Sequence, residues 1–80
     1  PYTDPFADWP HFVAMVSVRD GRRIRREAAV FHSEEQAEHW RRDVISRTSE
    51  AQRPTVQATV RQFPNRALAE VFARQWRQGG

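Results

Sequence analysis

The stretch HFVAMVSVRDGRRIRREAAVF, residues 11–31, decides the fold because it holds two strands and the turn that joins them. Residues 11–18 are apolar at both odd and even positions, which is typical of a central strand with covered flanks. Asp20 and Gly21 supply the turn, and residues 22–31 supply the second strand. The sequence therefore predicts an antiparallel β-hairpin.

Two registers are open to this hairpin. A two-residue turn at Asp20-Gly21 would pair Val18 with Arg23, which mixes apolar and charged side chains on each face. A three-residue turn over residues 19–21 would pair Val16 with Ile24 and collect the apolar side chains on one face. We expect the three-residue turn because it buries one coherent face.

The rest of the chain alternates between helix and strand signals. A capping box at Ser33 begins a helix that runs to about residue 47. Residues 55–62 alternate between apolar and polar side chains and predict a third strand. Asn65 opens a second helix, which Gly79 ends. The residues expected on the inner stripes of the two helices are Ala37, Trp40, Val44, Ile45, Leu68, Val71, Phe72 and Trp76.

The two strand–helix units echo each other along the chain. A shift of 32 residues (63 − 31) places Phe31 on Phe63, and the same shift places the cap Ser33 on Asn65. Within the helices, the shift matches Ala37 with Ala69, Trp40 with Phe72, and an outward pair, Glu38 and Arg42, with Glu70 and Arg74. Chance similarity between two strand–helix units is the alternative explanation.

These elements predict an α+β domain over residues 11–80. We expect a three-stranded antiparallel sheet with the spatial order second–first–third and both helices on one face, a reduced ferredoxin-like arrangement. The other face would be open, with Val13 and Met15 at its middle. Residues 1–10 form a Pro-rich arm whose aromatic side chains, Tyr2, Phe6 and Trp9, are expected to pack on the domain.

Positive charge is concentrated in the hairpin. All 13 basic residues are arginine, and the formal net charge is +3 (13 − 10). Residues 19–26 hold five arginines and one aspartate, a local charge of +4, so the rest of the chain sums to −1. Guanidinium groups bind phosphate with two hydrogen bonds, and they also pair with acidic protein surfaces. The alternative is that they keep the edge strand soluble and unpaired. The candidate contact residues are Arg19, Arg22, Arg23, Arg25, Arg26 and Arg61.

Several function classes lack the residues they require. The chain has no cysteine, no Gly-rich phosphate loop and no apolar run of membrane-spanning length. Its three histidines lack the spacing of a metal site. We therefore expect no enzyme activity, no cofactor, no metal, no small-molecule substrate and no membrane partner, and a cytoplasmic monomer or weak homodimer.

Two resemblances point to partners. The segment FHSEEQAEHW, residues 31–40, resembles a strand-to-helix segment of small type I anti-CRISPR proteins, which implies an inhibitor that docks on a CRISPR surveillance complex. The basic turn DGRR, residues 20–23, followed by an aromatic residue, a polar cap and an Ala-containing helix, resembles the arm-type DNA-binding domains of tyrosine integrases. Those domains have three strands before the helix, whereas this chain has two.

Two functions are therefore expected. The first is a non-enzymatic inhibitor of phage or mobile-element origin that docks on nucleic-acid-handling machinery through the arginine hairpin and the open sheet face. The alternative is a nucleic-acid-binding module whose hairpin contacts phosphates directly. The open-face contact requires both helices to lie on one side of the sheet.

Overall fold

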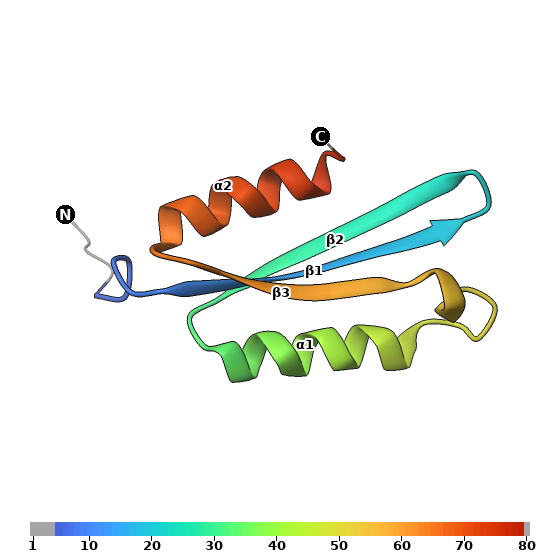
Figure 1. Cartoon of the computed structure of the whole chain (residues 1–80), viewed down its shortest axis with the longest axis horizontal. Helices are drawn as coiled ribbons and strands as arrows, with labels where there is room; N and C mark the ends of the chain where they lie inside the picture. Colours follow the sequence, from blue (N-terminus) through green and yellow to red (C-terminus); the bar gives the residue numbers. More distant parts are fainter. Residues whose placement is uncertain (1–4, 80) are drawn as a thin grey trace.

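Two strand–helix units flank one shared central strand in the computed structural model, which describes residues 5–79. The elements in chain order are β1 (His11–Asp20), β2 (Arg23–Phe31), α1 (Glu34–Arg47), the short 3-10 helix η1 (Arg53–Thr55), β3 (Gln57–Phe63) and α2 (Arg66–Arg77). The three strands form one antiparallel sheet with the order β2-β1-β3. This confirms the α+β class and the strand order expected from the sequence (Figure 1).

The hairpin register differs from the expected one. Val16 lies opposite Glu27 rather than Ile24, and Asp20 lies opposite Arg23, which leaves a two-residue turn at Gly21 and Arg22. Gly21 has a φ of +65°, the positive value that a type II′ turn requires at its first central residue. Both registers considered from the sequence were wrong because they placed Gly21 at the end of the turn instead of its beginning.

This register divides the sheet into two faces. Val13 and Met15 of β1 share a face with Ala28 and Val30 of β2, and Phe63 of β3 joins them. We call this the α2 face, because Ala69 and Ala73 of α2 complete its core. The opposite α1 face carries the alternate residues of the strands, including Ala14, Val16 and Val18, which are all buried.

The helices lie on opposite faces of the sheet, not on one face as expected. Trp40 of α1 packs near Phe31, which faces away from the α2 core, with ring centroids 6.4 Å apart. Figure 1 shows α2 above the sheet and α1 below it. Val13 and Met15, expected on an open surface, are buried under α2. The physical reason is that a strand apolar on both faces needs a covering layer on each side.

The repeat read from the sequence is visible as a pseudo-two-fold relation about β1. Both predicted caps accept a hydrogen bond from a backbone N–H of the first helical turn: Ser33 Oγ from Gln36 N at 3.5 Å, and Asn65 Oδ1 from Leu68 N at 2.9 Å. The aromatic pair Phe63–Phe72, with centroids 5.0 Å apart, corresponds to the pair formed by Phe31 in the other unit.

The Glu–Arg pairs expected in both helices differ from those in the structure. Glu38 pairs with Arg41 at 2.9 Å, and Glu70 pairs with Arg66 at 3.6 Å. Arg42, the expected partner of Glu38, is exposed.

The inner stripe of α2 is built from small residues. Ala69 and Ala73 are fully buried, whereas Leu68 and Val71, expected inside, are 48% and 47% exposed. Alanine allows the helix to approach the sheet closely, and Phe72 flanks this contact. On α1, Ala37 is fully buried as the sequence predicts.

The described part of the N-terminal arm contacts the start of the sheet and of α2. The Phe6 ring stacks on His32 with centroids 5.3 Å apart, and the Arg66 N–H donates to the Ala7 carbonyl at 2.9 Å. Trp9 meets Phe6 edge-on at 4.7 Å. Tyr2, the third aromatic residue of the arm, lies outside the described residues.

Candidate functional site

The end of the β1–β2 hairpin extends beyond the rest of the sheet. The β1–β3 ladder ends at the pair Ser17–Gln57, whereas the β1–β2 ladder continues to Asp20–Arg23. At about 3.4 Å per residue, this continuation is about 10 Å long. Figure 1 shows it projecting past the C-terminal end of α2. We call residues 19–26 the arginine hairpin.

The arginines of this hairpin are distributed over its two faces and its tip. Arg19 and Arg26 lie on the α2 face, and Arg23 and Arg25 lie on the α1 face. Arg22 is the second residue of the turn. Cations therefore surround the ribbon instead of forming one flat patch.

Four of these arginines form no ion pair with another residue in the described part of the chain. The ion pairs within residues 5–79 join arginines of the two helices to nearby carboxylates, and none involves the hairpin. Arg22, Arg23 and Arg25 are exposed. The fourth, Arg19, is also exposed, and its Nε donates to the Gly21 carbonyl within the turn at 3.3 Å. These guanidinium groups are available to an external anion.

Arg26 is held against α2. Its guanidinium carbon lies 5.2 Å from the centre of the Trp76 ring, a cation–π contact. A Cβ built on Gly79 would lie 3.1 Å from Arg26 Nη1, so the end of α2 closes over this side chain. Arg26 Nε is buried and has no hydrogen-bond partner among the described residues. Arg26 therefore joins the hairpin to α2, in contrast to its four neighbours.

Arg61 lies apart from the hairpin. It is opposite Val13, six positions along β1 from Arg19, a separation of about 20 Å. Its guanidinium carbon lies 4.9 Å from the ring centre of Phe72 and 5.5 Å from that of Phe63. The structure thus brings together five of the six predicted contact residues and separates the sixth.

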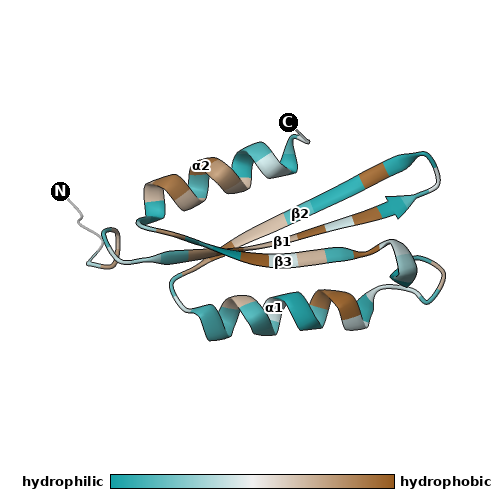
Figure 2. Ribbon diagram, in the orientation of Figure 1, coloured by the Kyte–Doolittle hydropathy of each residue, from teal (hydrophilic) through white to brown (hydrophobic). Residues whose placement is uncertain are grey.

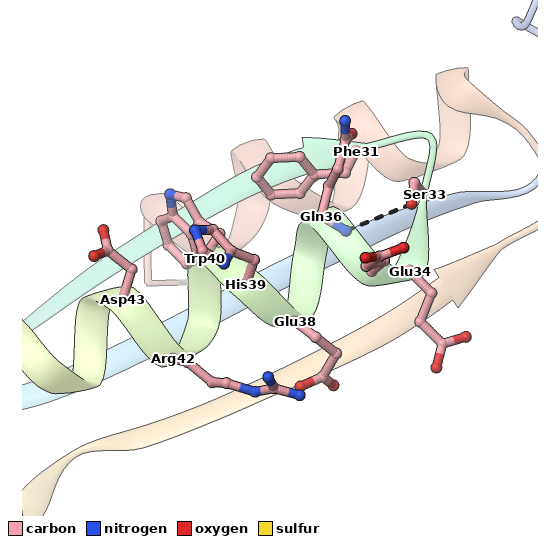
Figure 3. Close-up of a pocket in the computed structure, with 10 residues that line it drawn as sticks. Phe31, Ser33, Glu34, Gln36, Glu38, His39, Trp40, Arg42 and Asp43 are labelled. Atoms are coloured by element: carbon pink, nitrogen blue, oxygen red, sulfur yellow. Dashed lines mark hydrogen bonds between the residues drawn. The ribbon is translucent and has the colours of Figure 1, made fainter.

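A surface groove on the β2 side of α1 was missed by the sequence analysis. Figure 3 shows the rings of Phe31 and Trp40 on this side, with Gln36 between them and Ser33. The repeat matched Phe31 with Phe63 and Trp40 with Phe72, and the aromatic character of both positions in each unit was the signal that could have located it. Four carboxylates and one arginine surround it, of which Glu38 and Arg42 extend to the other side of α1 (Figure 3): Glu34, Glu35, Glu38, Asp43 and Arg42.

The groove and the arginine hairpin carry opposite charges at separate places along the molecule. The N-terminal half of α1 lies far from the hairpin tip along the 46 Å long axis (Figure 1). Hydrophilic residues dominate the hairpin end of β2 in Figure 2. Positive and negative surface charge are thus separated along the long axis of the molecule.

The histidines have structural surroundings. His11 is buried, and its Nδ1 lies 2.8 Å from the Trp9 carbonyl oxygen. His32 stacks on Phe6, and His39 is exposed on α1. No group of three or more His, Asp or Glu side chains within residues 5–79 is placed to hold a metal ion.

Among the described residues, no helix has the length and hydrophobicity needed to span a membrane. Comparisons of the chain with protein-family models, with curated proteins and with solved structures found no match. Inference about function therefore depends on the site itself.

Proposed function

We propose that this chain is a non-enzymatic binding module whose arginine hairpin contacts the phosphates of double-stranded nucleic acid. One observation carries the proposal: Arg19, Arg22, Arg23 and Arg25 form no ion pair within residues 5–79 and lie around a two-stranded ribbon that extends past α2. The expected open sheet face no longer contributes, because helices cover both faces.

The shape of the ribbon fits a groove of a duplex. The major groove of B-form DNA is wide enough for a two-stranded antiparallel ribbon, and phosphates line both of its walls. Arginines on both faces of the ribbon can therefore reach both walls, while Arg22 at the tip faces the groove floor. Arginine binds phosphate through two parallel hydrogen bonds, and such contacts position a protein without reading sequence.

The salt dependence of duplex binding tests this proposal. Four phosphate contacts predict that log K falls against log salt with a slope of about −3.6, because each contact contributes about −0.9. Arg23→Gln and Arg25→Gln should each reduce the slope by about 0.9. Arg74→Gln, which removes the same charge from an exposed position on α2, is the matched control and should leave the slope nearly unchanged.

Two results would reject phosphate contact through the hairpin. One is the absence of any duplex binding at low salt. The other is an equal loss of slope in Arg74→Gln and Arg23→Gln, which would indicate attraction by net charge alone. A cytoplasmic location accords with this proposal, and cell fractionation would test it.

A second candidate function is docking on a protein, as in an anti-CRISPR-like inhibitor of nucleic-acid-handling machinery. The observation that favours it is Ile24, which is 60% exposed on the α2 face of the hairpin, opposite Arg19. An exposed aliphatic side chain ringed by arginines resembles the centre of a protein interface more than a phosphate contact.

Ile24→Ser separates the two functions. A protein interface centred on Ile24 should lose at least about tenfold in affinity, since central interface residues commonly contribute 1.4 kcal/mol or more. Phosphate contacts should be nearly unaffected. The binding partners to compare are a DNA duplex and a purified type I CRISPR surveillance complex. If the variant binds both as the parent chain does, Ile24 has no role in docking.

A further inference from the structure

The two edge strands of the sheet, β2 and β3, differ in what lies against their outer edges. Over β2 lies α2, whose Arg77 donates from Nε and Nη2 to the Ala28 carbonyl at 3.3 and 2.9 Å. The outer part of β2 also carries the charges of Arg23 and Arg25. Charged side chains and a covering helix are the usual means by which an edge strand avoids pairing with another chain.

The β3 edge is also covered on one face by a helix, α1, but it carries far less charge. Gln57–Phe63 contains a single charged residue, Arg61, and no proline. Its ladder partner is β1, and the backbone hydrogen bonds outside the sheet and the helices include none to residues 57–63 within the described chain. A seven-residue strand with a free, nearly uncharged edge is a template for one more strand.

We propose that β3 pairs antiparallel with β3 of a second copy, which gives a six-stranded sheet of order β2-β1-β3-β3-β1-β2. The pairing is isologous, so one two-fold axis relates the two copies. With Val60 on the axis, Thr59 lies opposite Arg61 and no two like charges face each other. A register centred on Arg61 would place two arginines side by side and is disfavoured for that reason.

The position of α1 suits this dimer. On its face of the sheet, α1 contacts β1 and β3 more than β2. A helix that lies over β1 and is displaced toward β3 is about 2.4–4.8 Å laterally from β3, so a strand spacing of about 4.8 Å puts the two α1 axes about 10–14 Å apart. The lower value is at the upper end of the 8–10 Å range of packed helices, and at the larger value long charged side chains can still meet between the helices.

The side of α1 that would meet its copy carries both signs of charge. Figure 3 shows Glu38 and Arg42 on the side of α1 away from Phe31 and Trp40, toward β3. Arg42 is exposed and takes part in none of the ion pairs within residues 5–79. Antiparallel α1 helices can place each Arg42 near the Glu38 of the other copy, so the charges favour a second copy of this chain as the partner.

Sedimentation velocity of the whole chain over a concentration series tests the dimer and does not depend on nucleic-acid binding. We expect a mass that rises to twice that of the chain. Gln57→Lys with Thr59→Lys adds charges at two exposed positions of β3 and should raise the dimer dissociation constant at least about tenfold. Glu27→Lys, at an exposed position of β2, is the matched control and should leave the constant unchanged.

Single-cysteine variants give a second readout, because the chain has no cysteine of its own. Thr59→Cys should give linked dimers with a short bifunctional maleimide, whereas Glu27→Cys should not. The proposal is overturned if the chain stays monomeric at every concentration. It is also overturned if the β2 variants, instead of the β3 variants, control dimer formation or cross-linking. A monomer that captures an extended peptide of another protein on β3 would likewise reject the second copy as the partner.

Discussion

Arg26 shows how a single residue can belong to a charged cluster and still have a different role. Its guanidinium lies on Trp76, and its buried Nε lacks a hydrogen-bond partner among the described residues. Arg26→Met should leave the free energy of unfolding unchanged or raise it by up to about 1 kcal/mol, because methionine keeps the contact with Trp76 and removes the unpaired donor. Urea unfolding followed by tryptophan fluorescence measures this.

Duplex binding supplies the control for that substitution. Arg26→Met should keep nearly the parent salt slope, whereas Arg23→Met should lower it by about 0.9. If the two variants lose the same slope, Arg26 leaves Trp76 in the complex and contacts a phosphate. A large loss of stability in Arg26→Met would show that its charge is partnered.

Gly21 is the residue that sets the hairpin register. Its φ of +65° is strained for residues with a side chain, although no atom lies within 4 Å of a Cβ built there. Gly21→Ala should therefore lower the free energy of unfolding by about 1 kcal/mol through backbone strain alone. Gly21→Asn should cost less, since asparagine tolerates positive φ. Equal stability of the alanine variant and the parent in urea would argue against this turn.

At the scale of the element, the two helix caps differ in geometry. The Asn65 Oδ1 to Leu68 N distance is 2.9 Å, whereas the Ser33 Oγ to Gln36 N distance is 3.5 Å. Asn65→Ala should lower the free energy of unfolding by about 1 kcal/mol. Ser33→Ala should lower it less, because its longer hydrogen bond is weaker. Thermal unfolding followed by circular dichroism compares them. A larger loss in Ser33→Ala would reverse the ranking.

Element types were predictable because each depends on local chemistry. Ser33 and Asn65 mark helix starts by their side chains, and the alternation through residues 55–62 predicts a strand without reference to the rest of the chain. The strand itself is Gln57–Phe63, because Thr55 belongs to η1. The register was not predictable in the same way. It depends on which turn residue takes a positive φ, and Gly21 can do so at either end of the turn.

The candidate site was predictable only as a group. The sequence places five arginines in one hairpin, but it does not show that Arg26 is held by Trp76 and Gly79, some fifty residues further along the chain. Arg61 was assigned to the same surface because both helices were placed on one face. Its distance from the hairpin follows from the β1–β3 register, a long-range property.

At the scale of the whole molecule, β1 is a core strand on both of its faces. Met15 and Val16 are adjacent, point to opposite faces and are 3% and 2% exposed. Met15→Ala should cost about 2–5 kcal/mol, and Val16→Ala about 1.5–3 kcal/mol. In a two-layer domain one sheet face would be exposed, so only one of the two substitutions would lower the free energy of unfolding by this much. Chemical denaturation of both variants tests the three-layer arrangement, and a neutral result for either would contradict it.

The shared central strand also has a consequence for biosynthesis. During synthesis β1 emerges before the other elements of the sheet. Its second partner strand, β3, follows only at residues 57–63. A nascent chain that ends there already has every strand and α1, but Val13 and Met15 still face water until α2 emerges. A chain that terminates before α2 would therefore expose an apolar sheet face that chaperones or proteases recognise. A chain that includes α2 buries that face.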